Sequence, residues 1–295
     1  MTGTPVDVDA AERFVLANAR LLDRHRLAVL LHGAPIEPVL DGLRAYRNSD
    51  GGFGHALEPD IRAPTSEPSA TLHALVVLAR VGALEDPMVG EAAAWVASIA
   101  EPDGGVPFSL PAAAAHPHAP FLSLPASPGG SFFTLALAGL LWEAGSAEPW
   151  LERATDWSWA RLEEPGDLEA YGVKCALDFL DRVPDETRAN EAIERLRPHL
   201  EADGSIPVRG GAEHERLTVL TLSERPGARS RTLFTDELVE ADLDQLEQGQ
   251  QPDGGWMFDF GVWSPGQLAE CRGLVTLQAL ATLGAHGRLK RARAG

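Results

Sequence analysis

Apolar side chains recur every three to four residues along most of the chain, and proline is confined to the edges of the segments with this period. The spacing predicts amphipathic α-helices, because it gathers the apolar side chains on one helical face. The predicted helices span residues 8–31, 36–47, 68–82, 87–100, 131–145, 147–163, 167–181, 185–200, 213–223, 235–249 and 265–284. Strand signals are weak, and they allow only short extended pieces such as 105–108 and 205–208.

A turn of Asp-Gly-Gly or Asp-Gly-Ser followed by an apolar residue occurs four times, at intervals of roughly 50 residues or twice that. The four copies begin at Asp50, Asp103, Asp203 and Asp253. Aspartate accepts backbone hydrogen bonds in tight turns, and glycine adopts the positive φ angles that such turns require. We therefore expect these turns to have a structural role and no part in catalysis.

The predicted helices alternate between two types. One type ends in an Asp-Gly turn and comprises 36–47, 87–100, 185–200 and 235–249. The other type follows the turn, is more apolar and comprises 68–82, 131–145, 213–223 and 265–284, with 167–181 joining it by position. Two antiparallel sets repeated six times can close into a ring, with the more apolar set inside.

The predicted fold class is therefore all-α, an (α/α)6 toroid of alternating inner and outer helices. It forms one domain over residues 1–295, with a peripheral basic tail at 286–295. The last outer helix is short or absent, because the pattern yields one outer helix too few. An open α-solenoid is the alternative arrangement of the same repeats.

Composition narrows the range of partners. The 295 residues carry a net charge of −18, and the isoelectric point is about 4.8. This charge repels nucleic acids and anionic membranes, so neither is an expected partner. Two cysteines make no disulfide framework, the N-terminus lacks the basic part of a signal peptide, and the longest apolar stretch is too short to span a bilayer. We expect a soluble cytoplasmic protein, and a homodimer is left open.

Two of the four turns carry further residues that resemble a known motif. Gln250-x-x-x-Gly254-x-Trp256 is similar to the QW motif of the terpene cyclase and protein prenyltransferase superfamily, and Arg47 to Phe53 is a near match. Members of this superfamily are α/α barrels that carry the motif at the ends of outer helices. The resemblance implies a squalene-hopene cyclase-like toroid that binds an isoprenoid, or a similar small apolar molecule, in its lumen.

The chain departs from that superfamily in its catalytic motifs. It lacks the Asp-x-Asp-Asp motif with which class II terpene cyclases protonate an alkene, and it lacks the Asp-x-Cys element of the prenyltransferase zinc site. The nearest acidic pairs, Asp178 with Asp181 and Asp242 with Asp244, are typical of paired or solvated helix faces. No metal or cofactor is predicted, and Mg²⁺ would be needed only if the substrate were a diphosphate.

The loop that follows the first turn is the most distinctive segment of the chain. It contains His55, Glu58, Asp60 and Arg62, which can supply an acid, its partner and an anion contact. We predict Asp60, Glu58 and His55 as catalytic residues, with Asp60 or Glu58 donating the proton that starts a carbocation cyclisation. In the structural alternative, one of the two carboxylates binds Arg62 and fixes the loop.

Further candidates lie at the starts of the predicted inner helices, where unpaired N–H groups favour anions, and in the C-terminal loop. The predicted substrate-binding residues are Phe53, Arg62, His73, Tyr171, Lys174, His214, Phe260, Trp263 and Arg272. Aromatic faces among them would stabilise a carbocation. Lys174 points into the lumen if 167–181 is an inner helix and into solvent if it is an outer one. Acidic residues at the helix starts, Glu67 among them, also fit ordinary capping.

Two other functions fit the same pattern. A carbohydrate-active α/α barrel would use paired carboxylates, although aromatic residues make up only 6% of this chain. A non-catalytic toroid that binds a ligand or a protein would explain why no complete catalytic motif is present. The sequence nevertheless favours a terpene cyclase-like enzyme, with cyclase, isomerase, lyase or prenyl-transfer chemistry.

Overall fold

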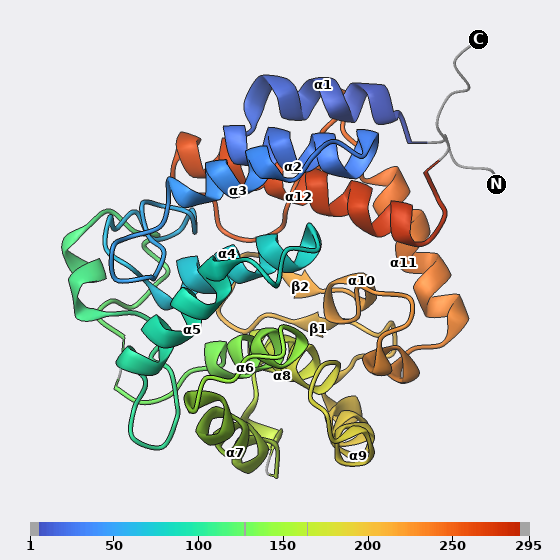
Figure 1. The fold of residues 1–295 in the computed structure, drawn as a ribbon. Coiled ribbons are helices and arrows are strands. Elements are labelled where there is room, and N and C mark those ends of the chain that lie inside the picture. The colour runs from blue at the N-terminus through green and yellow to red at the C-terminus, as the bar shows by residue number, and fades with distance from the viewer. Residues whose placement is uncertain (1–5, 127, 164, 290–295) are drawn as a thin grey trace. The chain divides into compact units, whose positions relative to one another are not determined.

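Helices make up most of the chain in the computed structural model, which describes residues 6–126, 128–163 and 165–289 (Figure 1). The α-helices are α1 Val8–Asn18, α2 Leu21–His32, α3 Glu37–Arg44, α4 Pro68–Arg80, α5 Pro87–Ile99, α6 Phe133–Glu143, α7 Trp150–Glu163, α8 Ala170–Leu180, α9 Glu186–Leu196, α10 Val219–Leu222, α11 Asp236–Gln248 and α12 Pro265–Ala285. Two short antiparallel strands, β1 Ile206–Pro207 and β2 Arg216–Leu217, pair Ile206 with Leu217. No helix in these ranges is both long and apolar enough to cross a membrane.

Two predicted helices are wrong. The segment 8–31 is interrupted at Ala19 and Arg20, whose extended backbones separate α1 from α2. The segment 213–223 contains only the single turn of α10, because Arg216 and Leu217 pair with β1 instead of joining a helix. The extended piece expected at 205–208 contains β1, whereas 105–108 contains no strand.

The chain divides into two compact units. Leu43–Leu200 form one, and the described residues up to Gly42 and from Glu201 onward form the other. In the unit of Leu43–Leu200, α4, α6 and α8 lie in a row, and α5, α7 and α9 pack against them (Figure 1). The row is the more apolar set, since every residue of α6 from Thr134 to Leu141 is buried.

The three helices of this row run in the same direction. Phe132, which caps the start of α6, stacks on Tyr171 near the start of α8. At the other end, Arg182 just beyond α8 pairs with Glu143 at the end of α6. Arg80, the last residue of α4, acts electrostatically on Asp178 near the end of α8. The N-termini of α4, α6 and α8 therefore meet at one end of the unit.

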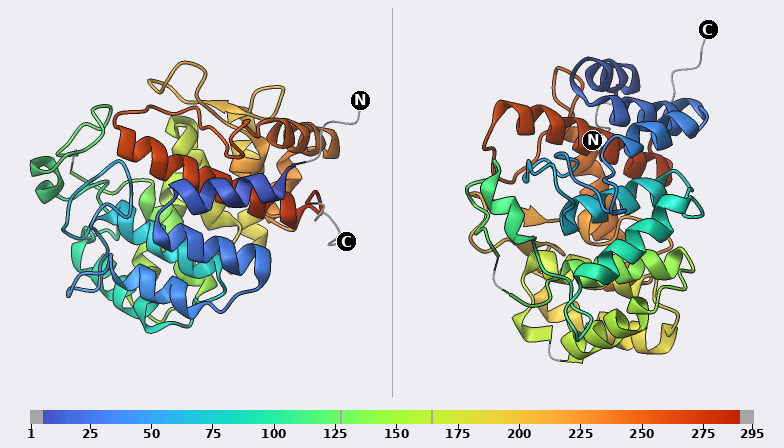
Figure 2. Two further views of the ribbon diagram at one scale, coloured as in Figure 1. Left: turned by 90° about the horizontal axis from the view of Figure 1, so that it is seen from above. Right: turned by 60° about the vertical axis from the view of Figure 1, so that its left-hand side comes forward.

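In the other unit, α12 lies beside α1 and α2, as both views of Figure 2 show. Leu277, Leu280 and Leu283 on α12 are buried, and a Cβ at Gly273 would meet the Cβ of Ala19 at 2.7 Å. This glycine thus permits the close approach of α12 to the break between α1 and α2. The terminal parts of the sequence consequently share one hydrophobic core.

The four Asp-Gly turns have the same geometry. In each, the aspartate Oδ1 accepts the N–H of the residue two positions later, and the intervening glycine has a φ between 80° and 98°. In three of the turns, a fully buried threonine on the following helix accepts the next amide. These pairs are Phe53 with Thr71, Val106 with Thr134, and Trp256 with Thr276. Each such bond fixes its turn against the helix that follows it, at the first turn of α4 and α6 and in the middle of α12.

Candidate functional site

A buried carboxyl group lies at the common N-terminal end of α4, α6 and α8. Glu67 precedes α4 and is 1% exposed. Its Oε2 accepts the N–H of Leu110 at 3.0 Å, while its Oε1 has no hydrogen-bond partner among the described residues. Burial raises the pKa of Glu67 from 4.5 to about 7, and the bond from Leu110 offsets part of this rise. Glu67 is therefore a carboxylic acid that keeps its proton up to near-neutral pH.

Local sequence fixes where this side chain lies. Pro68 occupies the first position of α4, and a residue before proline is restricted to extended conformations, as observed for Glu67. The N–H of Glu67 donates to the carbonyl of Phe53 at 2.8 Å, which ties it to the first Asp-Gly turn. Thr71, one turn later, accepts the amide of the same phenylalanine. The turn and the helix start thus hold Glu67 in one orientation.

Four aromatic side chains lie at the same end of the unit. Phe108, two residues before Leu110, stacks on Phe133 with ring centroids 5.1 Å apart. Phe132 meets Phe108 and Phe133 edge-on at 5.8 and 4.9 Å, and it stacks on Tyr171 at 6.5 Å. The three phenylalanines are half-buried, and Tyr171 is 37% exposed. We call these four residues the aromatic cluster.

The loop predicted to be catalytic lies between the first turn and α4. Its Glu58 comes close to His73 on α4, with 3.6 Å between Oε2 and Nδ1, and both side chains are partly exposed. His55 is exposed, adopts a left-handed φ of 55° and contacts Asn48 Oδ1 through Nε2 at 3.0 Å. The fold therefore places Glu58 close to His73, whereas His55 contacts Asn48 at the first Asp-Gly turn.

Asp60 and Arg62 hold this loop against a second segment through their backbones. The Asp60 carbonyl accepts the N–H of Ala119 at 2.8 Å, and the Arg62 N–H donates to the Pro117 carbonyl at 2.9 Å. A small apolar cluster lies beneath them and contains Ile61, Ala63 and Ala113, with Leu122 and Leu124 packed against it. The segment of Asp60 and Arg62 and the segment of Pro117 and Ala119 therefore pack against each other beside the start of α4.

Helix α8 belongs with α4 and α6, the row of the more apolar helices. On it, Lys174 binds Asp178 at 2.8 Å, and Arg182 lies 3.6 Å from the same carboxylate. Burial disfavours the charge of Asp178, but the cations Lys174 and Arg182 outweigh this and lower its pKa below the ordinary value. Lys174 and Asp178 thus form part of an ion-pair network, and Tyr171 on the same helix joins the aromatic cluster.

Four predicted binding residues belong to the other unit. His214 is highly exposed and adopts a φ of 70°, and it lies 3.5 Å from Glu213. Phe260 stacks on Phe258 with centroids 4.1 Å apart, and Trp263 is half-buried in the same loop. Arg272, the fourth of these residues, is bound at the last Asp-Gly turn.

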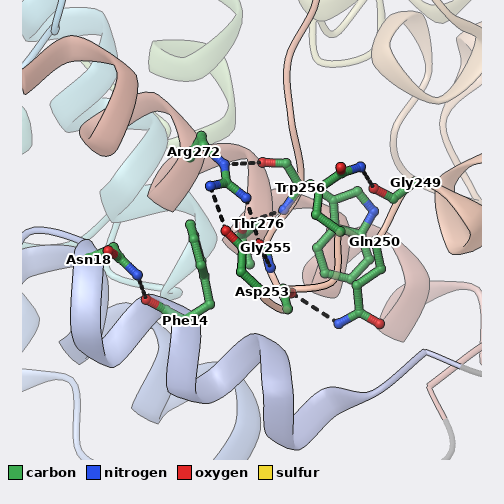
Figure 3. Close-up of polar contacts among 11 residues, drawn as sticks. Phe14, Asn18, Gly249, Gln250, Asp253, Gly255, Trp256, Arg272 and Thr276 are labelled. Carbon is green, nitrogen blue, oxygen red and sulfur yellow. Dashed lines mark hydrogen bonds and ion pairs between the residues drawn. The ribbon is translucent and has the colours of Figure 1, made fainter. Parts of the chain in front are cut away.

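The guanidinium of Arg272 donates hydrogen bonds to the last Asp-Gly turn, which begins at Asp253 (Figure 3). Its Nη1 and Nη2 each donate to a carboxylate oxygen of Asp253 at 2.8 Å, and its Nε donates to the Trp256 carbonyl at 3.2 Å. The guanidinium also lies 4.4 Å from the ring centroid of Phe14. Gln250 completes the turn by donating to the Gly254 carbonyl. The arginine thus joins the turn to α1 and α12.

Replacing Arg272 by Met is expected to lower the free energy of unfolding by about 1–2 kcal/mol, because two charge-assisted hydrogen bonds are lost at a half-exposed partner. Urea unfolding measures the change. Arg209→Met, at an exposed arginine of the same unit, is the matched control. Unchanged stability together with weaker ligand binding would instead support the substrate-binding role predicted from the sequence.

Glu67 and three members of the aromatic cluster were not among the predicted site residues. The sequence pattern assigns Glu67 to ordinary helix capping and indicates no role for Phe108, Phe132 or Phe133. The adjacent pair Phe132-Phe133 at the start of a predicted inner helix was the available signal. Within the described ranges, no group of three His, Cys, Asp or Glu residues is arranged to hold a metal ion.

No protein-family model matches this chain, and no curated protein sequence matches it. Solved structures do match. A protein from Actinoplanes is 17% identical with a TM-score of 0.58, and the match covers 95% of this chain and 98% of that one. A variant of the type II terpene cyclase MstE from Scytonema, in complex with its substrate geranylgeranyl dihydroxybenzoate, is 15% identical with a TM-score of 0.54, covering 95% and 97%.

A second MstE variant, in complex with its product merosterolic acid A, is 16% identical with a TM-score of 0.52 and coverage of 95% and 96%. At these identities the likeness concerns the fold alone. The chain therefore has a mostly helical, terpene cyclase-like fold, as the resemblance implied. Closure into a toroid stays a prediction.

Proposed function

We propose that this protein is a terpene cyclase-like enzyme that binds a polyprenyl or similar apolar substrate and starts its cyclisation with a proton from Glu67. The observation that carries the proposal is the buried carboxyl of Glu67, whose pKa is raised to about 7 by burial, at the same helix ends as the aromatic cluster. The fold that the chain shares with MstE, whose solved complexes hold a geranylgeranyl substrate, supports the same chemistry.

The proposed reaction is an isomerisation. Glu67 transfers its proton to the substrate, and a positive charge develops on a substrate carbon. A π bond of the substrate attacks that carbon, and the charge moves along the chain past the faces of the aromatic cluster, which attract a cation. Loss of a proton from the last cation ends the reaction, so the product has the mass of the substrate. The Leu110 N–H and the positive end of α4 stabilise the Glu67 carboxylate in the meantime.

The proposal assigns the proton transfer to Glu67 in preference to Asp60 or Glu58. A proton donor to an apolar substrate must be shielded from water, since water would take up the proton or quench the cation. Asp60 is half-buried, and Glu58 is 29% exposed and close to His73. Glu58, Asp60, His55 and Arg62 are proposed to position the loop and the substrate beside the acid.

Product analysis tests the proposal. The full chain is incubated separately with neutral polyprenes that end in an alkene, an epoxide or an aldehyde, with geranylgeranyl dihydroxybenzoate, and with farnesyl and geranylgeranyl diphosphate with and without Mg²⁺. Mass spectrometry and NMR then identify the products. We expect cyclised isomers of unchanged mass from the wild type and none from Glu67→Gln. Cyclisation that survives Glu67→Gln would reject the proton donor, and the absence of products from every substrate would reject the cyclase.

The aromatic cluster is expected to contribute to the rate. Phe132→Leu keeps an apolar side chain but removes a π face, and we expect kcat to fall by about tenfold, because a cation over an aromatic face gains up to about 2 kcal/mol. Early-terminated products should increase at the same time. Phe132→Tyr should keep most of the rate, and Phe121→Leu, at an exposed phenylalanine of the same unit, should change nothing. Equal rates for Phe132→Leu and the wild type would contradict this role.

A further inference from the structure

Three buried side-chain oxygens, at the start of α4 and in the segment hydrogen bonded to it, lack hydrogen-bond partners among the described residues. They are Glu67 Oε1, Ser69 Oγ and Ser109 Oγ. The three residues are 1%, 7% and 6% exposed. Ser69 is in the first turn of α4, two residues after Glu67, and Ser109 directly precedes Leu110, whose N–H binds Glu67 Oε2. The three unpartnered oxygens therefore belong to one helix start and to the segment hydrogen bonded to it.

All three groups can donate a hydrogen bond. Oε2 of Glu67 accepts the Leu110 N–H, so the proton of the neutral acid is on Oε1. Each serine hydroxyl also carries a proton that can rotate towards an acceptor. Buried polar groups in proteins are almost always hydrogen bonded, so these three donors lack the acceptor that such groups normally have. The acceptor belongs to the substrate, because Glu67 is the proposed proton donor.

We infer that the atom protonated by Glu67 is an oxygen, that of an epoxide or a carbonyl group on the apolar chain, and not the carbon of a simple alkene. An epoxide or carbonyl oxygen has lone pairs that can accept from Glu67 and from the serine hydroxyls. A carbon–carbon double bond offers only its π face, so it would leave the serine hydroxyls buried without an acceptor. This inference rests on the proposed function and specifies the substrate class of that same site.

The step balances without a further reactant. The proton moves from Glu67 Oε1 to the substrate oxygen, which Ser69 and Ser109 also hydrogen bond. With an epoxide, one C–O bond breaks as a substrate π bond attacks that carbon, and the oxygen becomes a hydroxyl group. With a carbonyl, the C=O π bond breaks in the same way. A proton lost from the final cation restores the acid, so substrate and product are isomers.

The three oxygens are buried, and this limits how a substrate can reach them. Since each is shielded from solvent in the structure, a substrate oxygen can reach them only after a local rearrangement of the residues around them.

Matched substrates test the inference. Three polyprenyl chains of equal length end in an alkene, an epoxide or an aldehyde, and kcat/KM is measured for each with the full chain. We expect the epoxide or the aldehyde to be cyclised at least about 100-fold more efficiently than the alkene. Ser69→Ala and Ser109→Ala should each lower kcat/KM for that oxygen-containing substrate by about 5- to 100-fold. Ser98→Ala is the control, because that hydroxyl already donates to the Trp95 carbonyl.

The outcomes separate the two proposals. Preference for the alkene, with no effect of either serine variant, would overturn the oxygen acceptor and keep the cyclase. If no substrate reacts, thermal unfolding is compared with an unreactive polyprenyl ether and with the matching hydrocarbon. A larger rise in Tm with the ether that is lost in both serine variants would keep the acceptor site and reject the cyclase. Equal shifts would overturn the acceptor site as well.

Discussion

Glu67→Gln is expected to lower kcat for cyclisation by about a hundred- to ten-thousandfold, the usual contribution of a general acid. Glutamine has nearly the same shape, and its carbonyl oxygen can still accept the Leu110 N–H. Its amide, however, has no acidic proton to donate. The loss should therefore appear in kcat while the far-ultraviolet circular dichroism spectrum stays that of the wild type.

The pH dependence of the wild-type rate gives a second readout of the same residue. The pKa of Glu67 is raised to about 7, so the acid form is present below that pH and disappears above it. The rate should be highest on the acidic side and decline tenfold per pH unit well above pH 7. Asp60→Asn and Glu58→Gln should keep this profile and lose less activity. A Glu67→Gln enzyme with the wild-type rate would exclude the assignment.

The stability of the wild type relative to Glu67→Gln is expected to fall by about 2–3 kcal/mol between about pH 5 and pH 8. The carboxyl titrates at about 7 in the folded chain and near its ordinary value of 4.5 in the unfolded chain. Between these values the folded state holds a proton that the unfolded state has released, so raising the pH favours unfolding. Above pH 7 both states are ionised, and the difference levels off.

Urea unfolding at several pH values measures this difference, with the variant subtracted from the wild type so that other titrating groups cancel. Glutamine does not titrate, and only Glu67 should contribute to the remaining slope. Glu152→Gln, at an exposed glutamate of the same unit, is the matched control variant. Parallel stability curves for wild type and Glu67→Gln would mean that Glu67 is already ionised in the folded protein, which would also remove the basis for its role as acid.

Helices with strong local signals are predicted well from this sequence. Helix α5 begins at Pro87 after the capping Asp86, as expected, and α12 begins at Pro265 after the capping Ser264. No proline or glycine in the sequence indicates the break between α1 and α2. It coincides with the close approach of Gly273 to Ala19, a contact between residues at opposite ends of the sequence. Tertiary packing therefore overrides the helical pattern at that point.

The residues of the candidate site also differ in this respect: local sequence reveals some of them, and only the fold reveals the others. The loop of Glu58 and Asp60 was recognisable because its charged residues are adjacent in the sequence. The acidity of Glu67 is not recognisable in this way, because it arises from burial and from an amide 43 residues away. The same holds for Arg272, whose charge is bound by Asp253 once the turn and α12 pack together. Local sequence identifies which groups are present, and only the fold determines which of them are shielded.

The packing of α1 against α12 has a consequence for the order in which the protein matures on the ribosome. The side-chain amide of Gln250 both accepts from and donates to the backbone of Asp7, which is 243 positions earlier. Helices α1 and α2 are translated before the unit of Leu43–Leu200, yet α12 is translated after it. The middle unit can therefore complete its core during synthesis. Helices α1 and α2 must instead wait for α12, and chaperones would encounter their apolar faces in that interval.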